Sequence, residues 1–499
     1  MSTKAEALPA TTAAPDQELI KGLGLTSATT LVMGSMIGSG IFIVSADIAR
    51  LVNSPALLIL AWLITGFMTI TGALAYGELA AMMPKAGGQY VFLRESLGPL
   101  WGFLYGWTLF LVIQTGTIAA VGVAFGKFLG YFFPAIAADN WIVHVGSGNI
   151  GLSWQNLVAI LVVLLLSGIN VFGIRTGALV QNVFTIAKVS ALLGLVLVGI
   201  FVGRNPEAIA ANFGDFWRNA SLGAQHAVSV GGAMVGTLAI LAVAQTGSLF
   251  SADAWNNVTF TAAEVKNARR NLPLALALGT GVVIALYLAA NFVYLTVLPL
   301  NGDPNGTTVF TRGIQHATAD RVGTAVMEQM FGATGAALMA VAIMLSTFGC
   351  ANGLILSGAR VYYAMAKDKL FFQPVARVHP RYRTPAIALA VQAVWTCLLC
   401  LSGSYGQLLD YIVFAVLIFY VLTIVSLFVL RRTRPDAERP YRAIGYPVLP
   451  ALYIIVALYI DVVLLLYKPQ YTWPGLIIVL LGIPVYYAWS RSARRAVNP

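Results

Sequence analysis

The chain has 499 residues, of which 59% are hydrophobic and only 10% are charged. A soluble globular protein has a charged fraction of about 25%, so this composition excludes that class and indicates a protein embedded in a lipid bilayer. The formal net charge of +11 gathers in short segments between apolar stretches, which favours a role in membrane topology over nucleic-acid binding.

Apolar stretches long enough to cross a bilayer, about 20 residues each, recur along the chain. We predict twelve membrane-spanning helices and hence an all-α polytopic membrane protein. They lie near residues 25–50, 55–82, 98–133, 153–172, 176–202, 226–259, 273–299, 333–366, 384–402, 407–430, 446–467 and 472–490. Several exceed the minimum length, so we expect tilted or broken helices.

The ends of the chain predict its orientation. Residues 1–20 are polar and mixed in charge, with no apolar run typical of a cleaved signal peptide, and we expect a disordered cytoplasmic tail. With an even number of spans, the segments then assigned to the cytoplasm hold most of the Lys and Arg residues. They include a basic linker at 431–445, before helices 11 and 12 within 446–490, and a second tail at 491–499.

The first span contains the sequence MGSMIGSGIF at 33–42, with three glycines and two serines. A helix broken inside the membrane is tolerated only where the freed backbone groups find partners. The amides of Gly38, Ser39 and Gly40 would form a positive helix end that binds a carboxylate, and the carbonyls around Met36 and Ile37 would accept from an ammonium group. Together they describe an α-amino acid site, although small residues also let helices pack closely.

A second sequence of this kind, GSLFSADAWNN at 247–257, lies in the sixth span. Interrupted helices at matching positions in two halves are typical of a transporter built from repeats. We therefore predict a ten-helix core over 21–430, with repeat one at about 25–202 and repeat two at about 226–430.

Side chains of the second break have two interpretations each. Asp253 is either an N-cap for the amide of Trp255 or Asn256, or a partner for a substrate ammonium or a cationic side chain. Phe250 is a gate over the ligand or a core aromatic residue. Trp255 and Asn256 line the site or pack against it.

Lys188 lies in the middle of the fifth span, where a charged ammonium costs about 2.5 to 3.5 kcal/mol. We expect it to point into the bundle and donate to the freed carbonyls of the first helix. It is then either a coupling cation or a structural pin.

The remaining sequence shows no pattern typical of a disulfide framework, a metal site or a catalytic site. Cys350, Cys397 and Cys400 all fall in predicted spans without nearby His or carboxylate, which argues against a disulfide framework or a metal site. The sequence has no Ser/His/acid constellation, HExxH or Walker loop, so we expect neither an enzyme nor a cofactor.

Segments outside the spans give three further expectations. Glu78, Lys85 and Arg94, at the inner end of the second span, are expected to be solvated or to snorkel. Pro273 suits the first turn of the seventh helix. The outer segment 300–332 contains a helix-compatible stretch at 323–330 that we expect to act as a lid.

Over nearly its whole length the sequence resembles the amino acid-polyamine-organocation superfamily, and within it the L-type amino acid transporter branch and its bacterial relatives. The motifs that carry the resemblance are GSMIGSGIF at 34–42, YGELAAMMPKAGGQY at 76–90, LFSADAWNNVTFTAAEVKNARRNLP at 249–273 and STFGCANGLILSGARVYYAMAKDKLF at 346–371.

The resemblance implies the LeuT-type inverted-repeat fold of five plus five helices, with broken helices 1 and 6, two extra C-terminal helices, and alternating access. Amides of Gly38, Ser39 and Gly40 would then hold the substrate carboxylate, and carbonyls of Ile37, Phe250 and Asp253 its ammonium. The implied substrate site is Ile37, Gly38, Ser39, Gly40, Phe250, Ser251, Asp253, Trp255 and Asn256. Lys188 and Phe250 would serve coupling and gating, with Lys188 in the place of a sodium ion.

We therefore expect sodium-independent exchange of neutral L-amino acids across a bacterial cytoplasmic membrane. Three alternatives stay open: proton-coupled symport, exchange of cationic amino acids, and a sensor that binds amino acids without transporting them. Exchange of cationic amino acids stays open because several relatives carry Gly or Ser where this chain has Asp253. Animal members join a single-span glycoprotein through a cysteine between spans 3 and 4. That loop has none here, so we expect the chain to work alone, as a monomer or weak homodimer.

Overall fold

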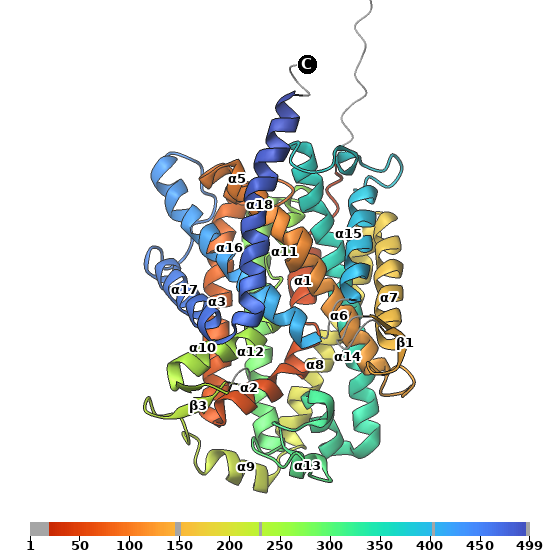
Figure 1. Cartoon of the computed structure of the whole chain (residues 1–499), viewed down its shortest axis with the longest axis vertical. Helices are drawn as coiled ribbons and strands as arrows, with labels where there is room; N and C mark the ends of the chain where they lie inside the picture. Colours follow the sequence, from red (N-terminus) through yellow and green to blue (C-terminus); the bar gives the residue numbers. More distant parts are fainter. Residues whose placement is uncertain (1–18, 145–150, 229–231, 402–404, 496–499) are drawn as a thin grey trace, which may run out of the picture.

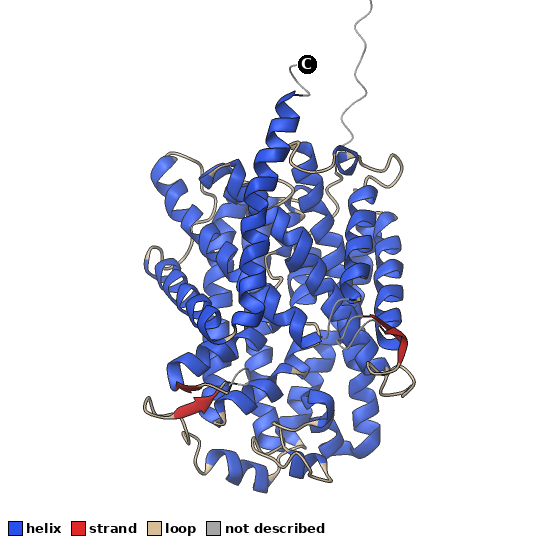
Figure 2. Ribbon diagram, viewed as in Figure 1, coloured by secondary structure: helices blue, strands red, loops and turns tan. Residues whose placement is uncertain are grey.

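The computed structural model describes residues 19–144, 151–228, 232–401 and 405–495. This part of the chain is mostly helical, with two short antiparallel hairpins (Figure 2). Most long helices run along the longest axis of the molecule (Figure 1). In keeping with the predicted orientation, we call the end that carries α5 the inner end and the end that carries α9 and α13 the outer end.

In the described residues, nine helical segments are long and apolar enough to cross a membrane. They are α3 (Pro55–Met82), α5 to α6 (Pro99–Leu129, with a π-helical turn η2 at Leu109–Ile113), α7 (Trp154–Val171), α8 (Ile174–Phe201), α12 (Ala268–Val297), α14 (Val322–Lys367), α16 (Tyr405–Thr433), α17 (Val448–Tyr467) and α18 (Pro469–Arg495). Two shorter apolar helices are α10 (Thr237–Ser251) and α15 (Ala386–Cys400). The predicted polytopic helical fold is confirmed, whereas the count of twelve spans and the five-plus-five repeat stay predictions.

The first predicted span is interrupted where its glycines indicate. Helix α1 (Leu25–Met36) ends in an extended residue, Ile37, with φ −75° and ψ 92°. The chain resumes as the 3-10 turn η1 (Gly40–Phe42) and then as α2 (Val44–Val52). The last helical bond of α1 runs from the Ile37 amide to the Met33 carbonyl at 2.9 Å. The predicted break is therefore confirmed.

The sixth predicted span is also interrupted, but it begins later than expected. Residues expected to be helical from 226 onward instead form the hairpin of β3 (Gln225–Ala227) and β4 (Met234–Gly236). Helix α10 then ends at Ser251, and the chain continues as α11 (Asn257–Phe260) and the turn η3 (Ala262–Glu264). Between them Ala254 has a left-handed φ of 64°. The second break is confirmed within 247–257.

Two expectations about the inner end are wrong. Pro273 lies inside α12, because that helix begins earlier, after the left-handed Asn267. Glu78 is fully buried rather than solvated, since its carboxylate accepts from Arg431 at 2.6 Å and from the Ala443 amide at 2.7 Å. The acid thereby ties the 431–445 linker to the end of α3.

The other two charges differ in their surroundings. Lys85 is exposed, as expected. Arg94 lies on α4 (Gln89–Leu97) and pairs with Glu95 and Asp368. The guanidinium of Arg94 lowers the pKa of the Glu95 carboxyl below its usual value through a hydrogen bond.

Short elements cover the outer end: β1 (Trp141–His144), β2 (Gly151–Ser153), α9 (Pro206–Phe213), α13 (Val309–Arg312) and η4 (Thr318–Asp320). Helix α14 bends at Gly332, whose φ is 63°, so its first turns form a separate outer helix. The helix expected at 323–330 is confirmed. This segment packs on the outer half of the first span, where Arg50 and Asp320 form an ion pair at 2.7 Å. Its role as a lid stays a prediction.

Helix α8 shows how one helix serves both the core and the lipid. Leu179, Val183 and Ile186 are 64%, 57% and 62% exposed. Their spacing of three to four residues makes an apolar stripe, which suits lipid contact. The opposite face is buried and carries polar residues that include Thr185 and Lys188. This second face packs against α1 and α14 and brings the lysine to the broken helix.

Candidate functional site

The end of α1 is capped by side chains from other helices, beginning with Lys188. Its ammonium nitrogen lies 2.5 Å from the carbonyl oxygen of Gly34, 2.7 Å from that of Ile37 and 3.1 Å from that of Ser346. These three acceptors match the three donors of the ammonium group, which is 1% exposed. The predicted contact between Lys188 and the broken helix is confirmed.

Three more side chains contribute to the cap, and one of them is Ser346, whose hydroxyl donates to the carbonyls of Ile37 at 3.1 Å and Gly38 at 3.0 Å. The Cys350 thiol on α14 donates to the carbonyl of Ser35 at 3.0 Å. The Tyr287 hydroxyl on α12 lies 3.1 Å from the carbonyl oxygen of Met36 and 3.0 Å from that of Ser251, the last residue of α10. Each carbonyl from residue 34 to residue 37 therefore has a side-chain donor, and Tyr287 joins the two broken helices.

The amides on the other side of the break are in a different situation. Within the described residues, the backbone amides of Gly38 and Gly40 have no protein acceptor. Gly40 also abuts the second break, because a Cβ added there would lie 2.2 Å from the Ser251 hydroxyl and 2.9 Å from its Cα. The two breaks thus meet, with uncommitted donors on the side of η1. Ser39 is buried beside them at 1% exposure.

Asp253 does not have the capping role considered above. Helix α11 follows Asn256 and has no side-chain cap. The Asp253 carboxylate instead accepts a hydrogen bond from the Tyr420 hydroxyl at 2.5 Å. The capping interpretation is wrong because the chain turns at Ala254 with a positive φ and leads the carboxylate toward α16.

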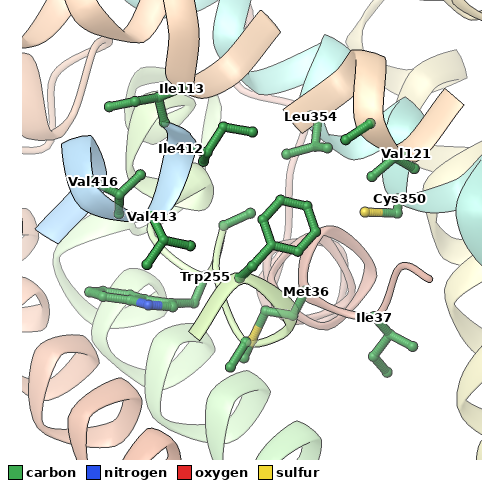
Figure 3. Packing of buried hydrophobic residues seen from close by; sticks show 14 of the residues in the cluster. Met36, Ile37, Ile113, Val121, Trp255, Cys350, Leu354, Ile412, Val413 and Val416 are labelled. Carbon is green, nitrogen blue, oxygen red and sulfur yellow. The ribbon is translucent and has the colours of Figure 1, made fainter. Parts of the chain in front are cut away.

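The remaining candidate residues of the second break pack against their surroundings. The Trp255 ring lies 4.8 Å from that of Tyr76 and 5.2 Å from that of Tyr420, centroid to centroid. Asn256 donates to the side chain of Gln89 at 2.8 Å. Phe250 is 7% exposed. Figure 3 shows how Met36 and Ile37 at the end of α1, Cys350 and Val121 on one side, and Trp255 and Val413 on the other surround this region.

Two small cavities border the pair of Asp253 and Tyr420. They have volumes of about 10 and 20 Å³, whereas ligand pockets typically have about 300 to 1,000 Å³. One also contacts Asn256 and Gln114, and the other Trp255. In these two cavities, Asp253 faces space that holds little more than a water molecule.

A buried ion pair lies inward of the site. Arg360 on α14 and Glu264 in η3 are 1% and 0% exposed and form two bonds of 2.7 and 3.1 Å. The Glu264 carbonyl accepts from the amide of Leu23 at 3.0 Å, and the Lys266 amide donates to the Leu23 carbonyl at 2.8 Å. The segment before α1 and the segment after α11 are thus joined along their backbones.

The sequence analysis assigned no role to four side chains that contact the two breaks. Ser346 and Cys350 are one helical turn apart, so their shared face was visible in the motif STFGCANG. Tyr287 and Tyr420 gave the weaker signal of a buried phenol, which usually needs a hydrogen-bond partner. No pattern in the sequence identified those partners.

A polytopic helical membrane protein in which two interrupted helices meet around uncommitted backbone dipoles has the architecture of a transporter rather than of an enzyme. The family described as amino acid permease matches residues 23–486. The chain belongs to this family of membrane transporters.

Similar proteins agree with this assignment. The chain is 31% identical to the serine/threonine exchanger SteT of Bacillus subtilis, over 95% of this chain and 98% of that protein. It is 28% identical to the human large neutral amino acids transporter small subunit 2, over 94% of this chain and 80% of that protein. It is also 28% identical to the human b(0,+)-type amino acid transporter 1, over 96% of this chain and 91% of that protein.

Proposed function

We propose that this protein transports L-amino acids by sodium-independent exchange, with neutral amino acids as its substrates. Transport proceeds by alternating access around the two breaks. The observation that carries the proposal is the asymmetry at the first break, where the carbonyls are capped by side chains and the amides of Gly38 and Gly40 are not. The similarity to a serine/threonine exchanger supports exchange.

The carboxylate of the substrate binds at the amides of Gly38, Ser39 and Gly40. These amides begin the outer half of the first span, where the helix dipole places about half a positive charge. An anion bound at such a helix end accepts hydrogen bonds from the backbone amides. In the described residues, the amides of Gly38 and Gly40 have no protein acceptor and can donate to it. Opening of the contact between Gly40 and Ser251 gives access.

The ammonium of the substrate binds on the side of the second break. The Ile37 carbonyl already has the Lys188 ammonium at 2.7 Å and the Ser346 hydroxyl at 3.1 Å, which occupy both of its lone pairs. The Asp253 carboxylate has the Tyr420 hydroxyl as a partner, and among the described residues no cationic side chain lies at ion-pair distance from it. We assign the ammonium to Asp253 and to backbone carbonyls of the second break at Phe250 and Asp253, with Phe250, Ser251, Trp255 and Asn256 around them.

Lys188 supports sodium independence. Carbonyl oxygens freed by a broken helix are ligands that suit a monovalent cation. Here an ammonium group occupies the carbonyls of Gly34, Ile37 and Ser346. The fixed charge of Lys188 takes the role of a bound ion, and its release from the carbonyls during the cycle would couple helix movement to transport.

A cationic substrate is the second candidate, favoured by one observation. Asp253 borders both small cavities near the breaks, so its charge is available to a substrate side chain as well as to an α-ammonium. We further propose that the protein lies in the cytoplasmic membrane of a bacterium with both termini inside. It works without an accessory subunit, because the loop at 134–153 has no cysteine through which a partner would be linked.

Uptake into proteoliposomes tests this proposal. Labelled serine, leucine and arginine are offered to vesicles that are empty or loaded with unlabelled amino acid, in sodium or in choline buffer. Exchange requires flux only into loaded vesicles and the same flux in both buffers. Uptake into empty vesicles driven by a proton gradient would establish symport instead. Binding that stabilises the protein without any flux would establish a sensor and refute transport.

A further inference from the structure

A cavity near the inner end does not belong to the site described above. Its volume is about 690 Å³, within the range of pockets that bind small molecules. It lies between the segment that precedes α1, the loop between α3 and α4, the segment after α11, the start of α12, and Tyr363 of α14. Its polar lining is Lys21, Lys85, Asn267, Arg269, Arg270 and Tyr363.

The described residues of the lining carry four cationic groups and no acidic one. Arg269 pairs with Glu438 at 2.6 Å outside the cavity, in an exposed contact of 57% and 70%. Within the described part of the chain, Lys21, Lys85 and Arg270 have no carboxylate at ion-pair distance. Among the residues that the structure describes, the lining of the cavity therefore carries an excess of positive charge.

The first turn of α12 adds to this charge. The helix has 30 residues, and its N-cap, Asn267, makes no side-chain hydrogen bond to the first turn. Asn267, Ala268, Arg269 and Arg270 all line the cavity. The positive end of the helix dipole thus faces the same space as the cationic side chains.

The positive charge of the cavity lining indicates which kind of ligand it would bind. A zwitterionic amino acid brings an ammonium group that three unpaired cations repel, whereas a phosphate group carries about −1.5 to −2 charges at neutral pH and offers several acceptor oxygens. We propose that this cavity is a binding site for a phosphate group, carried either by a small soluble compound or by the head group of an anionic phospholipid. The bound phosphate would contact Lys21, Lys85 and Arg270 and so join three separate segments at the inner end.

The test measures thermal stability of the purified full-length protein and so does not depend on transport. In detergent the protein is titrated with inorganic phosphate, with potassium chloride at equal ionic strength as reference. In nanodiscs, pure phosphatidylcholine is compared with mixtures that contain phosphatidylglycerol. The variant Lys85→Gln/Arg270→Gln is compared with a matched control, Arg377→Gln/Arg432→Gln, which changes two exposed arginines outside the cavity.

We expect an anion-dependent rise in the melting temperature of the wild type and the control, and an apparent affinity at least about tenfold weaker in the Lys85/Arg270 variant. A response to inorganic phosphate identifies a soluble ligand, and a response only to phosphatidylglycerol identifies a lipid head group. No response to either, or an equal loss in both variants, overturns the proposal. If the double variant does not fold, Lys85→Gln alone replaces it, since this side chain is exposed.

Discussion

The ammonium nitrogen of Lys188 lies 2.7 Å from the carbonyl oxygen of Ile37, the residue at which the first helix stops. Replacing Lys188 with Ala leaves the Gly34 carbonyl without its buried side-chain donor, at a cost of about 1 to 3 kcal/mol, and leaves the Ile37 carbonyl with the Ser346 hydroxyl alone. We expect transport to be lost while the protein still inserts. Uptake and membrane abundance are measured together, with the exposed Lys266→Ala as control. Normal flux in Lys188→Ala would refute the role in coupling.

Gly40→Ala tests the contact between the two breaks. An added Cβ would lie 2.2 Å from the hydroxyl of Ser251, so the breaks must separate, whereas a Cβ on Gly24 meets nothing within 4 Å. Gly40→Ala should weaken amino acid binding, Gly40→Leu should abolish it, and Gly24→Ala should have no effect. Substrate-induced thermal stabilisation gives the affinities. Wild-type affinity in Gly40→Leu would exclude the proposed carboxylate site.

Tyr287→Phe removes the hydroxyl shared by the carbonyls of Met36 and Ser251. We expect a loss of about 1 to 3 kcal/mol and a lower transport rate, because the two breaks lose a common partner. Tyr294→Phe is the matched control on the same helix, since its hydroxyl contacts one carbonyl, that of Ile41, at 3.3 Å. Thermal melting and uptake are compared for both, and an equal effect would contradict the linking role of Tyr287.

Asp253→Asn keeps a hydrogen-bond acceptor for Tyr420 but removes the negative charge. If Asp253 holds the substrate ammonium, affinity should fall at least about tenfold with little change in stability. Tyr420→Phe is the companion variant, because it removes the bond of 2.5 Å and leaves the charge. Unchanged affinity in Asp253→Asn would show that backbone carbonyls alone bind the substrate ammonium.

Arg360→Met should destabilise the protein by about 3 to 5 kcal/mol, since it leaves the carboxylate of Glu264 buried without its partner. The double variant Glu264→Gln/Arg360→Met should recover much of this loss. Arg269→Met breaks an exposed ion pair and should cost at most about 1 kcal/mol. The melting temperatures of the variants are compared. Equal melting temperatures for Arg360→Met and Arg269→Met would contradict the larger contribution expected of the buried ion pair.

The features that could be predicted from the sequence are those in which a residue type conflicts with its surroundings. Glycines and serines in an apolar span located the break after Met36, and the cost of a charge in mid-membrane directed Lys188 toward it. The start of the sixth span was misplaced because the valine- and alanine-rich hairpin of β3 and β4 has the hydropathy of a helix.

Contacts between distant residues could not be predicted. Asp253 and Tyr420 are 167 residues apart, and Glu78 and Arg431 are 353 residues apart. A single sequence shows an acid near the end of a span but not which of many basic or phenolic groups the fold brings to it. The alternatives for Asp253 and the solvated interpretation of Glu78 therefore depended on local rules that tertiary partners overrode.

The backbone bonds between Leu23 and the residues on either side of Val265 have a mechanical consequence. They fasten the beginning of the first helix to the far end of the sixth, across the inner end of the molecule. Any tilt of one of these half-helices must pull the other with it unless the bonds break first. In the proposed alternating-access cycle, opening toward the inside would therefore move both segments together.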